Sequence, residues 1–300
     1  MGPKLFILYL FDVEKKLPED CNSYFYCDDG TVTTSHKIEN VMQEKCQTIM
    51  NDLNEWFAEH SLFLNAEKTK IIRFHSYQNP IKQLSINLNG VDVQKGGSVK
   101  FLGVNLDENL NWKDHCQSLT SKLNSIAYQF KNLRQVLDEK ELIAVYYANC
   151  ESHLRYGVGL WGWSTGSKDV FVSQKNVLRS LLGLGYTASC KEHFKRLGIL
   201  TLPGIFIFEL CVYVFNNKCK FVSNESFHGV NTRQKNNLRE KQFRLEVTRK
   251  SPNYLGIKLY NTLPKSIQES ENLEDFKKSL KKYLSKKNIY DVAEFVIWHV

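Results

Sequence analysis

The chain has 300 residues, of which 42% are hydrophobic and 24% are charged, and this balance excludes an intrinsically disordered protein. Its formal net charge of +8 is compatible with a polyanionic partner and does not require one. The eight cysteines include no CxxC pair and lie mostly in apolar stretches, so we expect reduced thiols rather than a disulfide framework. We therefore expect an intracellular protein of the cytoplasm or nucleus, neither secreted nor inserted in a membrane.

The first predicted element is a short, largely buried helix over residues 3–16, with an apolar run at 5–11. Pro3 favours a helix start there, because proline is well tolerated at the first helical position. The apolar run has no cleavage site and leads directly into charged residues, which argues against a signal peptide.

The next predicted element is a β-hairpin over residues 23–35, because aromatic and β-branched residues flank Asp28-Asp29-Gly30. The residues alone leave two interpretations of the acid pair open. Asp-Gly is common in type I′ turns, where an exposed acidic tip has no special role. Alternatively, Mg²⁺ prefers carboxylate oxygens, and two-metal nucleotidyl transfer uses a cluster of them. Such a site would also need a carboxylate from elsewhere, because adjacent strand residues point to opposite faces.

Residues up to about 110 then alternate between helix and strand patterns. Apolar positions at three- and four-residue steps predict an amphipathic helix over 37–60. Asn89-Gly90 lies between alternating apolar residues in 84–93, which is a strong hairpin signal. Residues 64–74 are typical of a turn entering a strand, and 98–107 of a strand with a glycine at its bend.

From residue 113 the pattern becomes helical, which places the natural domain boundary near 108–113. Cys190 and His193 have metal-like spacing, but there is no second pair, so we interpret them as a helix start. Residues 230–237 are predicted to be a polar linker. The predicted helices are a long one from 113 with an apolar stripe up to Leu137, two over 139–156 and 168–183, one after Ser189, and a buried one within 198–215.

The predicted fold is an α+β N-terminal part over 1–110, followed by a mainly α-helical region over 111–229 and a basic C-terminal region over 230–300. Residues 231–287 contain 15 Lys/Arg against 6 Asp/Glu, a net charge of +9. One interpretation is a surface that binds nucleic acid. The other is the solvated face of a lysine-rich helix over 276–287, with Phe276, Leu280 and Leu284 on the opposite side.

A set of short motifs occurs in a fixed order along the chain. The stretch "YFYCDD" is followed by "LNAEKTKIIRF" and then by "VKFLGVNLDENLNWKDH". This ordered set resembles the reverse transcriptases of LINE-type, jockey-like non-LTR retrotransposons, in which the first stretch is similar to the Tyr-x-Asp-Asp catalytic turn. Further positions that match the family are Leu64, Asn65, Lys68, Thr69, Asp107, Leu110, Trp112 and His115, with the stretches 2–12, 99–104, 152–162, 195–202 and 259–267.

The resemblance implies an RNA-directed DNA polymerase that takes an RNA template, a DNA primer and a dNTP. Asp28 and Asp29 would be the catalytic ligands of Mg²⁺, completed by the triphosphate and the primer 3′-hydroxyl. Lys68 would lie near the triphosphate, although an ordinary solvated lysine at a strand start remains an open alternative. Residues 1–110 would form an incomplete polymerase palm and 111–229 the thumb with its extension.

Phe101, Leu102 and Gly103 would form the primer grip by the same resemblance, and an ordinary core strand is compatible with that role. The family's palm carries a further Asp on an earlier strand and a Gln-Gly element, and we find neither of these nor a fingers region in this sequence. We therefore expect no polymerase activity from this chain alone. The alternatives are a non-catalytic nucleic-acid-binding remnant and an unstable product of a truncated element copy.

Overall fold

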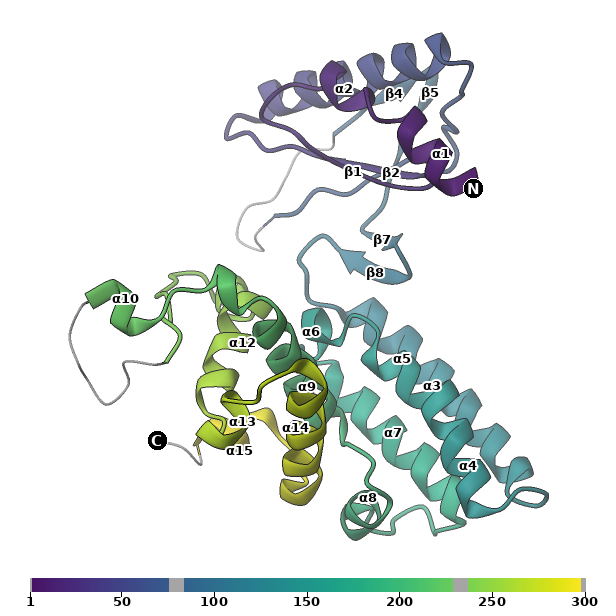
Figure 1. Ribbon diagram of the computed structural model, residues 1–300. Coiled ribbons are helices and arrows are strands. Elements are labelled where there is room, and N and C mark those ends of the chain that lie inside the picture. The colour runs from purple at the N-terminus through teal and green to yellow at the C-terminus, as the bar shows by residue number, and fades with distance from the viewer. Residues whose placement is uncertain (1, 76–83, 229–236, 298–300) are drawn as a thin grey trace. The chain divides into compact units, whose positions relative to one another are not determined.

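The computed structural model describes residues 2–75, 84–228 and 237–297 (Figure 1). The chain forms two compact units, one of residues Met1–Phe101 with Leu106–Leu110 and the other of Leu102–Asn105 with Asn111–Val300. We call them the N-terminal unit and the helical unit and describe each by itself. The predicted linker over 230–237 lies outside the described residues, except for its last position.

The N-terminal unit begins with helix α1 (Gly2–Tyr9), followed by a 3-10 turn, η1 (Val13–Lys16). The prediction of one largely buried helix over 3–16 is wrong, because the helix ends at Tyr9 and much of its apolar surface faces solvent. Leu8 and Phe11 are 68% and 73% exposed, whereas Leu10 and Val13 pack on Trp56 in a small buried cluster. The apolar composition of residues 5–11 predicted that these side chains are buried, but the N-terminal unit supplies few apolar side chains that pack against α1.

A β-hairpin and one long helix follow. Strands β1 (Asn22–Tyr26) and β2 (Asp29–Thr33) pair antiparallel, which confirms the predicted hairpin. Helix α2 (Glu39–Glu59) confirms the amphipathic pattern, with Ile49 and Trp56 on its buried side. The C-terminal end of this helix therefore supplies the large side chain around which the start of the chain packs.

The remaining strands are short and form separate two-stranded sheets. Asn89 and Gly90 both have positive φ, 52° and 83°, as a type I′ hairpin turn requires. Leu102 and Gly103 also have positive φ, 43° and 84°. Residues 98–107 therefore form a hairpin rather than the single bent strand that we predicted. The strands are β3 (Lys70–Ile71) parallel to β6 (Gln94–Lys95), β4 (Asn87–Leu88) with β5 (Val91–Asp92), and β7 (Ser98–Phe101) with β8 (Val104–Asp107).

The helical unit confirms the predicted change of pattern after residue 113. Its long first helix, α3, packs along α7, and the apolar stripe predicted from the sequence is buried at Leu119, Leu123, Ile126 and Phe130. The helices are α3 (Lys113–Leu133), α4 (Glu139–Val145), α5 (Ser152–Arg155), α6 (Val158–Trp161), α7 (Ser167–Leu182), α8 (Lys191–Leu197), α9 (Leu202–Asn216), α10 (Asn224–His228), α11 (Glu246–Arg249), α12 (Pro252–Asn261), α13 (Lys265–Gln268), α14 (Leu273–Lys287) and α15 (Val292–Ile297), with a π-helical segment, η2 (Tyr146–Glu151), and a 3-10 turn, η3 (Lys218–Lys220).

Helix α9 is the centre of this unit, and it contacts α6, α12 and α14 (Figure 1). Most of its side chains are buried, as predicted for 198–215. Among the described residues no single helix is long and apolar enough to cross a bilayer. Only α8 and α9 taken together, with a bend of 46° between them, have the length and apolar composition of a candidate span.

One buried polar side chain fixes the start of α9. Gln174 on α7 is fully buried, and its amide nitrogen donates to the Tyr146 hydroxyl and to the Leu200 carbonyl, each at 2.9 Å. Its amide oxygen accepts from the Leu202 backbone N–H at 2.8 Å. Because a buried polar group without partners costs free energy, these three bonds make a glutamine tolerable in the core and hold α7 against the entry to α9.

Candidate active site

The acid pair lies at the tip of the β1–β2 hairpin, and the turn comes two residues earlier than the sequence predicted. Tyr26 pairs with Asp29, so the two-residue loop is Cys27-Asp28 rather than Asp29-Gly30. Cys27 has a φ of 56°, and positive φ at the first loop position alone is the pattern of a type II′ turn, not the expected type I′. Gly30 has a packing role instead, because a Cβ there would lie 2.9 Å from the Phe25 ring.

Asp28 and Asp29 are both exposed, and neither carboxylate forms a hydrogen bond or ion pair with the described residues. Their oxygens are donors of the kind Mg²⁺ accepts. However, no group of three or more His, Cys, Asp or Glu side chains gathers anywhere in the described part of the chain. Among the described residues, the acid pair therefore has no third ligand side chain beside it.

Two other acids of the N-terminal unit already have cationic partners. Asp12 pairs with Lys15, and Asp20 pairs with Lys45. The hydrogen bond from Lys45 lowers the pKa of the Asp20 carboxyl below its ordinary value. Neither side chain is therefore a ready substitute for a third metal ligand beside Asp28 and Asp29.

Lys68 lies in a compact turn just before β3. The Asn65 side-chain oxygen accepts from the Lys68 backbone N–H at 3.1 Å, and the Thr69 hydroxyl donates to the Asn65 carbonyl at 2.8 Å. Asparagine and threonine are thus required by the turn itself, which explains their spacing in the Leu-Asn-x-x-Lys-Thr motif. The Lys68 side chain is exposed, so its proximity to a triphosphate stays a prediction.

The turn of the β7–β8 hairpin, which contains the predicted primer-grip residues Leu102 and Gly103, contacts the Tyr156-Gly157 turn of the helical unit. The Tyr156 hydroxyl donates to the Leu102 carbonyl. A Cβ at Gly103 would lie 3.3 Å from the Tyr156 ring, and one at Gly157 would lie 3.4 Å from the Val104 side chain. Two glycines therefore allow close contact, and the tyrosine holds the hairpin turn in place.

His115 supports the other side of the same hairpin turn. Its Nδ1 accepts from the Asn105 backbone N–H at 3.4 Å, and its ring lies 5.5 Å from that of Trp161. Trp161 in turn donates from Nε1 to the Tyr156 carbonyl at 3.0 Å. Burial lowers the pKa of His115 below its ordinary value of 6.5, so the imidazole is neutral at pH 7 and can accept this bond.

Arg155 anchors the segment that carries Tyr156. Its guanidinium pairs with Glu151 in η2 at 2.7 Å and with Glu209 on α9, and it lies 4.9 Å above the Phe208 ring. An arginine shared by two carboxylates and an aromatic face fixes the direction in which the next residues leave the helix. The sequence resemblance included 152–162 but assigned no role to Tyr156 or Arg155.

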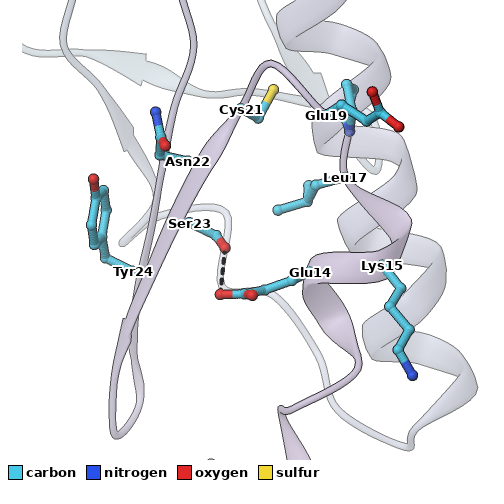
Figure 2. A pocket seen from close by; sticks show the side chains of 9 residues that line it. Glu14, Lys15, Leu17, Glu19, Cys21, Asn22, Ser23 and Tyr24 are labelled. Atoms are coloured by element: carbon cyan, nitrogen blue, oxygen red, sulfur yellow. Dashed lines mark hydrogen bonds between the residues drawn. The ribbon is translucent and has the colours of Figure 1, made fainter.

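A shallow, open depression lies at the other end of β1 (Figure 2). Residues 14–24 contribute its lining, and the Ser23 hydroxyl donates to the Glu14 carboxylate at 3.0 Å. The lining stops at Tyr24 and includes neither Asp28 nor Asp29. The depression is therefore separate from the acid pair.

Comparisons with known proteins extend the evidence from geometry. Residues 1–106 match the family described as reverse transcriptase (RNA-dependent DNA polymerase). No solved structure significantly matches the chain.

The chain is also similar to individual proteins of mobile elements. The chain is 23% identical over 194 residues to the probable RNA-directed DNA polymerase from transposon X-element of Drosophila melanogaster. It is 22% identical over 194 residues to the RNA-directed DNA polymerase from mobile element jockey of the same species. Each alignment covers 61% of this chain and 21% of the relative. A polyprotein from the retrotransposable element R1 of Bradysia coprophila is 21% identical over 139 residues, covering 45% of this chain and 14% of the relative.

Proposed function

We propose that this chain is the palm end and thumb of an RNA-directed DNA polymerase of a non-LTR retrotransposon. The observation that carries the proposal is the reverse transcriptase match over residues 1–106, within which the two carboxylates stand exposed at a two-residue hairpin tip. The similarity to mobile-element polymerases over 194 residues extends beyond that segment and supports the inclusion of the helical unit.

In a complete polymerase of this kind, RNA template, DNA primer and a dNTP would be the partners. Asp28 and Asp29 would supply oxygen ligands for Mg²⁺, which would stabilise charge at the reacting phosphate. Lys68 would neutralise charge on the triphosphate. Phe101, Leu102 and Gly103 would lie against the primer strand, and the contacts of Tyr156 and His115 would keep that hairpin turn in a fixed position.

We further propose that the chain alone does not polymerise, because its acid pair lacks a third carboxylate among the described residues. The site is tested in a chimera in which the matching segment of the jockey polymerase is replaced by the corresponding residues of this chain. We expect primer extension by the chimera, and its loss to background in Asp28→Asn and Asp29→Asn variants. The matched control is Asp52→Asn, a substitution of another N-terminal-unit aspartate away from the hairpin tip. A folded chimera that extends primers equally well with both Asn substitutions would contradict the proposed site.

We propose that the protein acts inside the cell, in the cytoplasm or nucleus, where an RNA template would be found. Fluorescence microscopy of the tagged chain tests this proposal. A signal confined to the medium or to membranes would contradict it.

A further inference from the structure

Two cysteines of the N-terminal unit, Cys21 and Cys46, have no part in the proposed polymerase site. Cys21 ends the turn that follows η1 and directly precedes β1, whereas Cys46 lies on α2. Both residues are half-buried, and both thiols are free. We call these two residues the 21–46 pair.

The segment that carries Cys21 is held beside α2. The preceding turn, η1, contacts α2. Asp20, the residue before Cys21, pairs with Lys45 of α2. On the other side of Cys21, the Ser23 hydroxyl donates to the Glu14 carboxylate at 3.0 Å, which ties the start of β1 back to η1. The backbone on each side of Cys21 is therefore fixed either to α2 or to the turn that packs on it.

Cys46 lies on the inner side of α2. It precedes the buried Ile49 by three residues, and residues at that spacing share one face of a helix. Burial raises the pKa of the Cys46 thiol, and the nearby Cys21 thiol raises it further. A charge on one thiol is therefore felt by the other, as expected for two sulfur atoms that are close in space.

The two thiols differ in their access to solvent. Cys21 belongs to the lining of the open depression at the start of β1, so a small molecule in solution can reach it (Figure 2). Cys46 is not part of that lining. This arrangement gives an accessible thiol for a first reaction and a sheltered thiol beside it for a second.

The third cysteine of the N-terminal unit is too far along the chain to replace Cys46. Cys27 lies at the other end of β1, and five residues of strand span about 17 Å, whereas the Cα atoms of a disulfide lie within about 7 Å of each other. In the helical unit, burial raises the pKa of four thiols and so disfavours their reactive thiolate form. These four are Cys116, Cys150, Cys190 and Cys211.

We propose that the 21–46 pair is a site of reversible thiol–disulfide exchange whose substrates are small disulfides. The Cys21 thiolate attacks one sulfur of the small disulfide, and the leaving thiolate takes up a proton. Cys46 loses its proton to solvent and attacks the Cys21 sulfur of the mixed disulfide, which releases the second small thiol. In sum, two protein thiols are oxidised to one disulfide, and one small disulfide is reduced to two thiols.

The closed bond ties the start of β1 to α2 in a unit whose buried apolar cluster is small. A covalent link across about 25 residues restricts the unfolded chain and so favours the folded state. Amide hydrogen exchange over 22–33 should therefore be slower in the oxidised chain than in the reduced chain. In the variant Cys46→Ser, which cannot close the bond, the same treatment should leave this exchange unchanged.

The test treats the full native chain with bis(2-hydroxyethyl) disulfide, blocks the remaining thiols with N-ethylmaleimide and maps the bonds by mass spectrometry. Chymotrypsin cuts at the aromatic residues 24–26, so Cys21 and Cys27 fall in separate peptides. We expect a peptide pair linked through Cys21 and Cys46 that dithiothreitol separates. The bond should form faster in the native chain than in concentrated urea, because the fold brings the two thiols together.

Single variants separate the roles of the two thiols. Cys46→Ser should stop at the mixed disulfide on Cys21, and Cys21→Ser should leave Cys46 to be recovered as its N-ethylmaleimide adduct. The matched controls, Cys27→Ser and Cys219→Ser, each remove a thiol outside the pair and should form the bond at the rate of the original chain. Circular dichroism establishes that each variant keeps its helices.

Three results would overturn the inference. One is recovery of both Cys21 and Cys46 as N-ethylmaleimide adducts after treatment of the native chain. Another is a bond from Cys21 to Cys27 in place of Cys46. The last is a Cys21–Cys46 bond that forms no faster in the native chain than in urea, because the fold would then not position the thiols. None of these measurements involves Asp28 or Asp29, so the outcome is independent of the proposed polymerase site.

Discussion

In the helical unit, α9 buries nearly all of its apolar side chains. In the N-terminal unit, the similarly apolar α1 and the turn after it leave Leu5, Leu8 and Phe11 more than 60% exposed. The buried cluster around the start of the N-terminal unit consists of Leu10, Val13 and Trp56. A helix contributes to stability only through the partners that cover it, so the same composition has a different effect in each unit. The helical unit should therefore dominate the unfolding free energy of the chain.

The largest change in stability is expected from a substitution in the core of the helical unit. Phe276→Ala removes a fully buried ring that stacks on Phe215, and it should cost about 3–5 kcal/mol of unfolding free energy. Leu8→Ala in α1 is the matched control and should change stability by less than about 0.5 kcal/mol, because the side chain is 68% exposed. Urea denaturation followed by circular dichroism measures both. Equal costs for the two substitutions would contradict the contrast between the units.

The next effect concerns the polar contact within the same core. Gln174→Leu leaves the Leu202 N–H and the Leu200 carbonyl without their buried partner, and we expect a loss of at least about 1–3 kcal/mol. Gln135→Leu, at an exposed position after α3, is the control and should be close to neutral. Thermal unfolding of the three proteins gives the comparison. A Gln174 variant as stable as the original chain would show that the three bonds do not hold α9.

A smaller effect is expected at the β7–β8 turn. Gly103→Ala places a Cβ 3.3 Å from the Tyr156 ring at a φ of 84°, which should cost about 1–2 kcal/mol. Gly97→Ala in the neighbouring loop has open space around its Cβ and no positive φ, so it should be nearly neutral. Hydrogen exchange of the hairpin amides should rise in the first variant only. Similar exchange in both would remove the evidence that Tyr156 fixes the turn.

The smallest effect is a pH dependence from His115. Its folded pKa lies below the ordinary value of 6.5, so the folded state binds fewer protons than the unfolded state. The resulting stability is present above about pH 6.5 and is lost as pH falls through that value toward the folded pKa. His115→Gln should flatten this acid limb of the stability curve, measured by denaturation between about pH 7 and 5. An unchanged acid limb would mean that other groups cause it.

The sequence predicted those elements whose signals are local. The helical stripe from Leu119 to Phe130 and the Asn89-Gly90 turn were confirmed, because side-chain period and turn chemistry act over a few residues. The hairpin with the acid pair was also confirmed, but its turn was predicted two residues late. Strand register there depends on pairing and on the Phe25 ring against Gly30, which no local pattern shows.

Sequence signals describe only part of the candidate site, for the same reason. The acid pair carried a recognisable motif, whereas the role of Tyr156 depends on a hydrogen bond to Leu102, 54 residues away. The stretch 152–162 resembles the same family, but nothing in its local pattern connects it to the hairpin. The exposure of α1 was missed because composition indicates which residues prefer burial and not whether partners are present.

We propose that Asp28 and Asp29 are a reverse transcriptase acid pair and that this chain alone does not polymerise, because no third carboxylate joins them among the described residues. Primer extension by the purified chain, with Mg²⁺, an RNA template, a DNA primer and dNTPs, tests it most directly, alongside the Asp29→Asn variant. The account predicts no product above background from either protein. Robust synthesis by the original chain that is lost in the Asp29→Asn variant would contradict it.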